Sequence, residues 1–276
     1  MTELLAYWNL RERPFEATWD TRFYFQSRDH DEALNRLAYL VGERTMNLGM
    51  LTGEVGCGKT LTRAVFSSRL DPKQFAVIVQ DTSAFPFKDL LGSVLTTLDP
   101  TGVGTTKFAR SERLTKSAKR LHDEGRHLVL IFDEAQEMTP ATMNDLKMLT
   151  NLNGGGQNYL TIVLLGQPEL RNKIVKLPAI DQRISLRFHL NPLNLTEAGA
   201  YLVHRLKAAG HPSGDVFAPD AVAQLFGACH GVPRELNRLA KLALEVAWLR
   251  QMPQVAASAV DTVIRDLSRH QNLCAA

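Results

Sequence analysis

The sequence predicts an α/β protein in which helices cover a parallel sheet and a small all-helical domain follows. Up to Pro192, short apolar runs rich in Val, Ile and Leu alternate with longer helical patterns. Several of these runs are apolar on both faces, as strands buried between two layers of helices must be. After Pro192 only helical patterns remain, which indicates a change of architecture.

The expected strands of the first part are short and are separated by helices. We expect strands at 46–52, 75–80, 127–132, 159–166 and 185–190, with helices at 59–70, 86–98, 107–124 and 139–150. This alternation favours right-handed crossovers and a layered domain. The segment NLNGGGQN (151–158) predicts a mobile turn. It is either a plain connection or a loop that senses a nucleotide or a partner.

The second part is expected to be a bundle of four helices. The helical patterns cover 196–209, 218–229, 233–250 and 257–269, with a break at 210–214. Thr196 and Glu197 are plausible first residues of this bundle. The sequence therefore predicts an α/β domain over 1–191 and a helical lid domain over 192–276.

Composition points to a soluble, cytoplasmic protein without membrane contact. The 276 residues are 45% apolar and 22% charged, and no apolar run reaches the roughly 20 residues of a membrane helix. The start has no secretory pattern. Cys57, Cys229 and Cys274 form neither a metal spacing nor a disulfide framework.

The stretch GEVGCGKT (53–60) fits the phosphate-loop pattern G-x-x-x-x-G-K-[ST] between a strand and a helix. Glycines allow successive backbone N–H groups to face a phosphate, and the helix N-terminus adds positive partial charge. Lys59 would reach the β- and γ-phosphates, and Thr60 would bind Mg²⁺. The predicted nucleotide-binding residues are Gly53, Glu54, Val55, Gly56, Cys57, Gly58, Lys59, Thr60 and Leu61.

Two adjacent carboxylates follow the apolar run HLVLIF (127–132). Asp133 is a candidate magnesium ligand, and Glu134 is a candidate to polarise the attacking water in phosphoryl transfer. The alternative is an acidic helix start, since carboxylates also favour that position. The glutamate favours hydrolysis of ATP over simple nucleotide storage.

Beyond these two motifs, the chain resembles the AAA+ ATPases, and among them the ExeA/GspA-like group, over roughly residues 7–250. The matching stretches are YWNLRERPFEATWDTRFYFQSRDHDEAL, LTGEVGCGKT, VLIFDEAQEM, LLGQPEL, LPAIDQRISLRFHLNPL and GVPRELNRLAKLAL. The resemblance implies a P-loop AAA+ sheet between helices, a helical lid, and ATP with Mg²⁺ as cofactors.

The resemblance also implies roles for single residues. Gln167 would sense the γ-phosphate, although it could be a plain polar residue at a strand end. Arg183, with Arg187 as the alternate, would be an arginine finger that reaches a neighbouring subunit's ATP. Arg234 would contact the nucleotide from the lid, or it starts a helix and forms a salt bridge. Residues 23–30 would wall the adenine. An arginine finger implies a homo-oligomer, either a ring or a helical filament.

The likeness leaves two functions open. Secretion members of the group carry a transmembrane segment and a peptidoglycan-binding domain after the ATPase, and this sequence shows neither. It therefore looks more like the transposition regulators TnsC, TniB and MuB, which assemble on double-stranded DNA with ATP and direct a transposase to its target. The alternative is a cytoplasmic ATPase that assists secretion-system assembly. A helicase of this type would need a second RecA-like domain, and the helical patterns after Pro192 do not predict one. A metabolic kinase would need a pocket for its acceptor substrate, and no stretch of the sequence resembles one.

Residues 101–126 are the candidate DNA surface, because they hold seven Lys/Arg against three Asp/Glu in a chain of net charge +3. On a helical wheel, Arg110, Arg113, Lys116 and Arg120 fall within about 120° of arc, beside an apolar face. A polar loop that starts at Gly102 precedes them. The predicted DNA-binding residues are Thr105, Thr106, Lys107, Arg110 and Arg113, in sequence-neutral contact with phosphates. The alternative is a solvated helix face.

Overall fold

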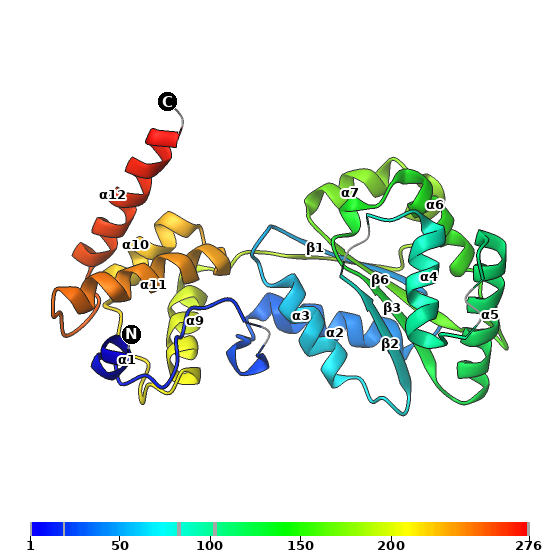
Figure 1. The fold of residues 1–276 in the computed structure, drawn as a ribbon, viewed down its shortest axis with the longest axis horizontal. Coiled ribbons are helices and arrows are strands. Elements are labelled where there is room, and N and C mark those ends of the chain that lie inside the picture. The colour runs from blue at the N-terminus through cyan, green and yellow to red at the C-terminus, as the bar shows by residue number, and fades with distance from the viewer. Residues whose placement is uncertain (1, 19, 82–83, 102–103, 275–276) are drawn as a thin grey trace. The chain divides into compact units, whose positions relative to one another are not determined.

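The computed structural model describes residues 2–18, 20–81, 84–101 and 104–274. Its centre is a five-stranded parallel sheet in the order β2-β3-β6-β1-β7 (Figure 1). The strands are β1 (Leu48–Gly53), β2 (Phe75–Gln80), β3 (His127–Phe132), β6 (Leu160–Gly166) and β7 (Leu186–Leu190). The predicted parallel sheet between helices is confirmed.

Strand order places a topological switch point at β1. This strand pairs with β6 on one side and with β7 on the other, whereas the chain leaves β1 for β2 at the far edge of the sheet. In open parallel sheets, ligands bind beyond the carboxyl ends of the strands at such a point. The loop that follows β1 therefore starts where the topology favours a ligand.

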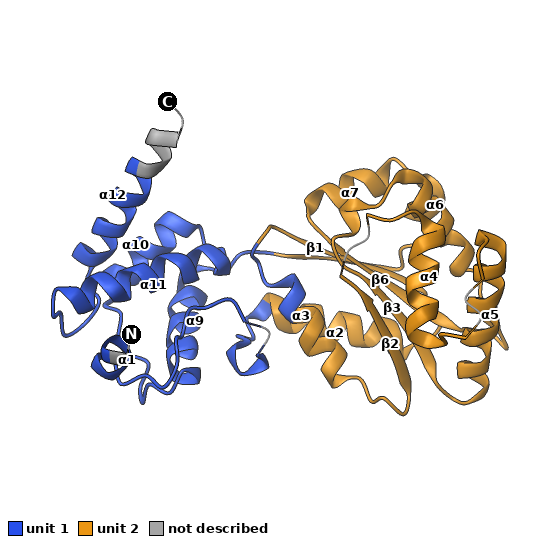
Figure 2. Cartoon of the chain, viewed as in Figure 1, with its two compact units in different colours: residues 1–28, 56–61, 191–276 blue, residues 29–55, 62–190 orange. Residues whose placement is uncertain are grey.

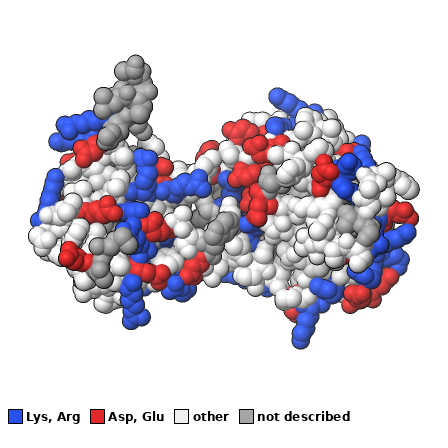
Figure 3. Space-filling model, viewed as in Figure 1, with Lys and Arg blue, Asp and Glu red and all other residues white. Residues whose placement is uncertain are grey.

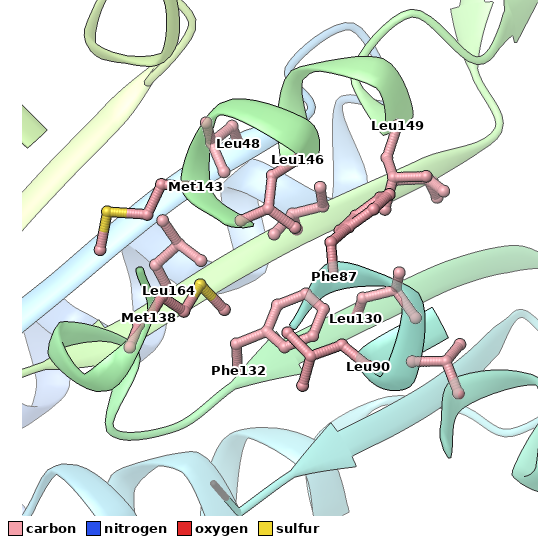
Figure 4. Close-up of a cluster of buried hydrophobic side chains, with 14 of the residues drawn as sticks. Leu48, Phe87, Leu90, Leu130, Phe132, Met138, Met143, Leu146, Leu149 and Leu164 are labelled. Carbon is pink, nitrogen blue, oxygen red and sulfur yellow. The ribbon is translucent and has the colours of Figure 1, made fainter. Parts of the chain in front are cut away.

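Helices cover both faces of the sheet. They are α2 (Arg28–Gly42), α3 (Lys59–Arg69), α4 (Phe87–Leu98), α5 (Lys107–Asp123), α6 (Pro140–Leu149), α7 (Pro168–Val175) and α8 (Pro178–Asp181). Leu48 and Met50 of β1 join a buried cluster with α4 and α6 (Figure 4). Gly49 faces the opposite way, because a Cβ there would collide with Leu40 of α2. Alternate residues of one strand thus pack on different helical layers.

The segment 151–158 closes as a small hairpin. Strands β4 (Asn153–Gly154) and β5 (Gln157–Asn158) pair antiparallel. Gly155 and Gly156 between them have φ angles of 61° and 79°, a region that glycine enters without steric cost. The Asn158 N–H donates to the Arg44 carbonyl at 2.8 Å. The expected turn is therefore tied into a closed, hydrogen-bonded arrangement.

The described chain forms two compact units (Figure 2): residues 29–55 and 62–190 around the sheet, and residues 1–28, 56–61 and 191–276 around the helices. The helical unit contains α1 (Thr2–Tyr7), α9 (Leu195–Ala208), α10 (Pro219–Cys229), α11 (Pro233–Leu249) and α12 (Ala257–Cys274). The described residues among 2–28, which were expected to belong to the sheet domain, pack with these helices. No helix among the described residues is long and apolar enough to cross a bilayer.

A buried arginine explains why the N-terminal segment packs on the helical unit. Arg205 of α9 is only 4% exposed. Its Nε donates to the Pro14 carbonyl at 2.6 Å and its Nη2 to the Glu16 carbonyl at 2.7 Å. The guanidinium also lies 4.6 Å from the centre of the Phe23 ring. Since a buried charge must be hydrogen-bonded to be tolerated, these contacts hold Pro14, Glu16 and Phe23 against α9.

The first helix of the C-terminal bundle starts one residue before the expected Thr196. Asn194 caps α9 by accepting a hydrogen bond from the Glu197 N–H at 2.9 Å, and the Glu197 side chain accepts from the Asn194 N–H at 3.0 Å. This reciprocal capping box satisfies two backbone donors that the helix itself leaves unpaired. It sets the beginning of the bundle at Leu195.

His127 makes the stability of the sheet depend on pH. Its side chain is fully buried at the start of β3 and lies 2.8 Å from the Thr161 hydroxyl. Burial lowers the pKa of His127 to about 4. Between pH 6.5 and 4 the unfolded chain therefore binds more protons at this residue than the folded chain, so stability falls as the pH drops through this window. From pH 7.5 to pH 5, we expect His127 to lower the free energy of unfolding by about 2 kcal/mol.

Urea unfolding of the wild type and of His127→Gln at these two pH values measures this effect. Glutamine retains a polar group near Thr161 but does not titrate. The variant should therefore lose less stability on acidification than the wild type. Equal losses in both proteins would contradict the assignment of the pH dependence to His127.

Candidate nucleotide site

The loop between β1 and α3 needs its glycines for distinct reasons. A Cβ on Gly53 would lie 2.8 Å from the Leu190 carbonyl oxygen, so only glycine lets β1 and β7 approach at this point. Gly56 and Gly58 have φ angles of 88° and 96°. Residues other than glycine adopt such backbone angles only with strain. Cys57 is fully buried between them. The backbone is thus shaped for a close approach to a ligand, and α3 begins at Lys59.

Arg234, the expected lid residue, contacts this loop. The Arg234 N–H donates to the Gly56 carbonyl at 3.2 Å. A Cβ on Gly56 would lie 2.6 Å from Cβ of Arg234 and 3.1 Å from Cγ1 of Val232. In the described part of the chain Arg234 forms no ion pair, whereas Glu235 pairs with Arg238 at 3.3 Å. The first turn of α11 therefore packs directly on the phosphate-loop backbone, and the alternative of a salt bridge at Arg234 finds no support.

The two carboxylates follow β3 in an unusual local conformation. Asp133 is 3% exposed, and its Oδ1 accepts a hydrogen bond from the Glu134 N–H at 2.9 Å. Glu134 has a φ of 48°, in the left-handed region. Residues other than glycine rarely adopt this conformation, and those that do are frequently found at functional sites. The 3₁₀ turn η2 (Ala135–Glu137) follows directly. This sharp turn separates the directions of two adjacent acidic residues.

Arg63 is a member of this group that the sequence analysis did not identify. Its side chain is 8% exposed, and Nη1 lies 2.5 Å from Asp81 Oδ1 and 3.5 Å from Asp133 Oδ2. A buried carboxylate requires such a partner. The available signal was the position of Arg63 four residues after Lys59, hence on the same side of the same helix.

The donor types fit a magnesium ion. Thr60 offers a hydroxyl and Asp133 a buried carboxylate, and Mg²⁺ prefers such oxygen ligands. Asp133 is held by its hydrogen bond from the Glu134 N–H and by the nearby Arg63 guanidinium. Its carboxylate is thus oriented by the protein itself.

Gln167 lies beside Glu134, and its role toward a phosphate stays a prediction. The side-chain Nε2 of Gln167 donates to Glu134 Oε2 at 3.4 Å. A second amide, that of Gln136, donates to the same oxygen at 2.6 Å. Gln136 belongs to the DEAQ sequence, but its role could not be recognised without the contacts. The end of β3 and the end of β6 thus form one polar cluster.

The two candidate arginine fingers lie outside this cluster. Arg183 follows α8, donating through Nε to the Thr150 hydroxyl at 3.0 Å and through Nη2 to Asn151 Oδ1 at 3.2 Å. Arg187 is in β7 and forms an ion pair with Asp181 at 2.8 Å. These partly exposed contacts are individually weak, so either side chain can be released toward another molecule. The structure leaves both alternatives open.

The cations of the candidate DNA surface are engaged within the chain. Lys107 pairs with Asp145 at 2.6 Å. Arg113 pairs with Asp99 at 2.5 Å. Arg110 donates to the Lys88 carbonyl at 2.7 Å and to the Gly104 carbonyl at 3.0 Å. The expected stripe of free positive charge on α5 is therefore largely neutralised by neighbouring groups.

The loop before α5 has a structural task as well. The Thr106 hydroxyl caps the helix by accepting from the Ala109 N–H at 3.1 Å, and Thr105 is exposed. Gly102 lies outside the described residues. On the face shown in Figure 3, basic and acidic atoms are interspersed rather than gathered in one basic surface. The apolar face of α5 is buried as expected, at Leu114, Ala118 and Leu121.

Residues 43–174 match the family model described as "AAA domain". A General secretion pathway protein A of Aeromonas hydrophila is 29% identical over 253 residues, which cover 88% of this chain and 45% of that protein. The chain thus spans less than half of the length of this relative.

Solved structures share the architecture. The Aeropyrum pernix ORC2 protein in ADPNP-ADP complexes has a TM-score of 0.70 and 17% identity, with 92% of this chain and 71% of that chain covered. The Aeropyrum pernix ORC1 protein in complex with DNA has a TM-score of 0.62 and 18% identity, with 90% and 67% covered. At these identities the likeness concerns the fold. The P-loop AAA+ fold with a helical C-terminal part, predicted from the sequence, is confirmed.

Proposed function

We propose that this chain is an AAA+ ATPase, which the match of residues 43–174 and the fold support, and that it binds ATP with Mg²⁺ and hydrolyses it to ADP and phosphate. One observation carries the proposal. Glu134 lies at the carboxyl end of β3 with its carboxylate held by two amides, Gln136 and Gln167, directly after the buried Asp133. A carboxylate in a fixed orientation beside a metal ligand is what activation of water requires.

Each residue has a definite task in this proposal. The N–H groups of the loop and the Lys59 ammonium bind the phosphates. Thr60 and Asp133 hold the magnesium ion, which would neutralise charge on the phosphate oxygens. Glu134 accepts the proton of the attacking water, and Gln167 contacts the γ-phosphate. Arg234 adds a positive charge from the first turn of α11.

Assembly is part of the same proposal. Arg183 or Arg187 would complete the ATP site of a neighbouring copy, because a fixed guanidinium stabilises the charge that develops in phosphoryl transfer. The expected assembly is a homo-oligomeric ring or helical filament that forms with ATP and loosens after hydrolysis. Sedimentation velocity with a non-hydrolysable ATP analogue tests this step, and a protein that stays monomeric would refute it.

We further propose that the assembly forms on double-stranded DNA and recruits a transposase or target-selection protein. Support comes from the fold, since the similar ORC1 structure is a complex with DNA. Lys107 retains 43% exposure of its side chain despite its ion pair with Asp145. Such exposed pairs contribute little, so Lys107 can exchange the carboxylate for a phosphate.

Neutralising two exposed cations of α5 should weaken DNA binding. Lys107→Gln combined with Lys116→Gln removes two charges and leaves the hydrogen bonds of Arg110 to the Lys88 and Gly104 carbonyls in place. We expect the slope of log K against log salt concentration to fall by about 2, because each phosphate contact contributes about 0.9. Fluorescence anisotropy with a labelled duplex at several salt concentrations measures this slope.

A matched control removes the same charge elsewhere on the unit that contains the sheet. Lys73→Gln with Lys176→Gln changes two exposed lysines outside α5 and should leave the slope nearly unchanged. If both double variants bind DNA as the wild type does, α5 is not the DNA surface.

The alternative function is assistance in the assembly of a secretion system, and the likeness to General secretion pathway protein A favours it. The two functions differ in their response to DNA. Oligomers that form only when ATP and duplex DNA are both present favour the transposition role. Assembly and hydrolysis that ignore DNA favour the secretion role.

A further inference from the structure

We infer that Gln136 is a positioning residue for hydrolysis: its side-chain amide holds the Glu134 carboxylate in the orientation that accepts a proton from water. The inference rests on the proposed ATPase function. It assigns to Gln136 a task distinct from that of Gln167, which must also serve the γ-phosphate.

The orientation of the Gln136 amide is fixed by its two partners. Its Oε1 accepts the backbone N–H of Gln167 at 3.1 Å, and its Nε2 donates to Glu134 Oε2 at 2.6 Å. A backbone N–H can only donate, so the carbonyl oxygen of the amide must face Gln167. The NH₂ group then faces Glu134, whose carboxylate can only accept. Gln136 is 8% exposed, so water competes little for either bond.

Contacts with Gly166 and Lys173 restrict the position of Gln136. A Cβ on Gly166, the last residue of β6, would lie 2.7 Å from Gln136 Oε1, so the amide occupies space that only glycine leaves open. On the other side, Lys173 of α7 donates to the Gln136 carbonyl and, at 3.4 Å, to the Met138 carbonyl. The 3₁₀ turn after Glu134 is thereby tied to β6 and to α7.

This arrangement has a chemical consequence for Glu134. Both amides approach Oε2, and among the described residues no donor is bonded to Oε1. Oε1 is therefore available for the proton of a water molecule. The Gln167 side chain is the more distant donor, at 3.4 Å, and can turn toward a phosphate. Gln136 then keeps the carboxylate in place, and a displacement of about 1 Å in such a group can cost about 100-fold in rate.

Two substitutions separate positioning from simple packing. Gln136→Glu keeps an oxygen that can accept from the Gln167 N–H, but it replaces the donor to Glu134. Gln136→Met has similar length and loses both bonds. We expect both variants to lower kcat about 10- to 100-fold, with KM and the Kd for ATP within about twofold of wild type. Melting temperatures are measured in parallel.

The outcomes decide between the possibilities. A wild-type kcat in Gln136→Glu with a reduced kcat in Gln136→Met would overturn the inference, because only the contact with Gln167 would then matter. A higher kcat in either variant would show restraint of Glu134 rather than positioning, and would also overturn it. Wild type and Glu134→Gln are measured in the same assay. If these two release phosphate equally slowly, the proposed function itself fails and the inference with it.

Discussion

Lys59→Ala is expected to reduce the affinity for ATP by about 100-fold or more. Lys59 is the first residue of α3, directly after the glycines of the loop, and its side chain is 6% exposed. Its ammonium would contact two phosphates, and each hydrogen bond to a charged group contributes roughly 1.5–3 kcal/mol. Isothermal titration with ATP and Mg²⁺ measures the change.

The control for this substitution is Lys73→Ala, which removes the same charge from an exposed position between α3 and β2. It should bind ATP as the wild type does. Circular dichroism of both variants establishes that the fold is retained. Unchanged ATP affinity in a folded Lys59→Ala protein would refute the assignment of residues 53–60 as the phosphate loop.

Glu134→Gln is expected to lower hydrolysis by about 100- to 10,000-fold, the usual contribution of a general base. Glutamine has the shape of glutamate but cannot take a proton from water. ATP affinity should be retained, because Glu134 contacts the water rather than the phosphates in the proposed mechanism. ATP-dependent oligomers should therefore persist for longer than those of the wild type. Single-turnover phosphate release and sedimentation velocity measure the two effects.

The chain offers a close control in Glu137→Gln, three residues further along and exposed. It removes one negative charge from the same turn without touching the polar cluster, so hydrolysis should remain close to that of the wild type. Similar losses in both variants would mean that the charge of the turn, and not a base at Glu134, governs the rate.

The strands of the fold could be predicted because they are local patterns. The run 127–132 is buried along its whole length, and β3 has the bounds that the sequence predicts. Helix α2 could also have been predicted, since Ala33, Leu34, Leu37 and Leu40 form an apolar stripe at helical spacing. It was not among the expected helices. The packing of the N-terminal segment with the helical unit could not be predicted from local sequence patterns. It depends on Arg205, which lies almost two hundred residues away in sequence from the carbonyls it binds.

Some residues of the candidate site could be predicted from local patterns, and others could not. The spacing of the loop glycines, of the Asp133–Glu134 pair and of Gln167 is visible in the sequence, because each follows a strand. Arg63 and Gln136 became visible only through their partners on other elements. The helical wheel of α5 could not predict the partners of its cations, for a related reason. It displays the cations of one helix, but it cannot reveal that Asp145 of α6 and Asp99 after α4 already pair with Lys107 and Arg113.

The most direct test of the account is phosphate release from ATP by the wild-type protein, compared with Glu134→Gln at equal ATP occupancy. Both proteins are loaded with ATP and Mg²⁺, and free phosphate is followed through one turnover. The account predicts release by the wild type at a rate at least about 100-fold above that of the variant. Equal rates in the two proteins, or intact ATP on a fully loaded wild type, would contradict it.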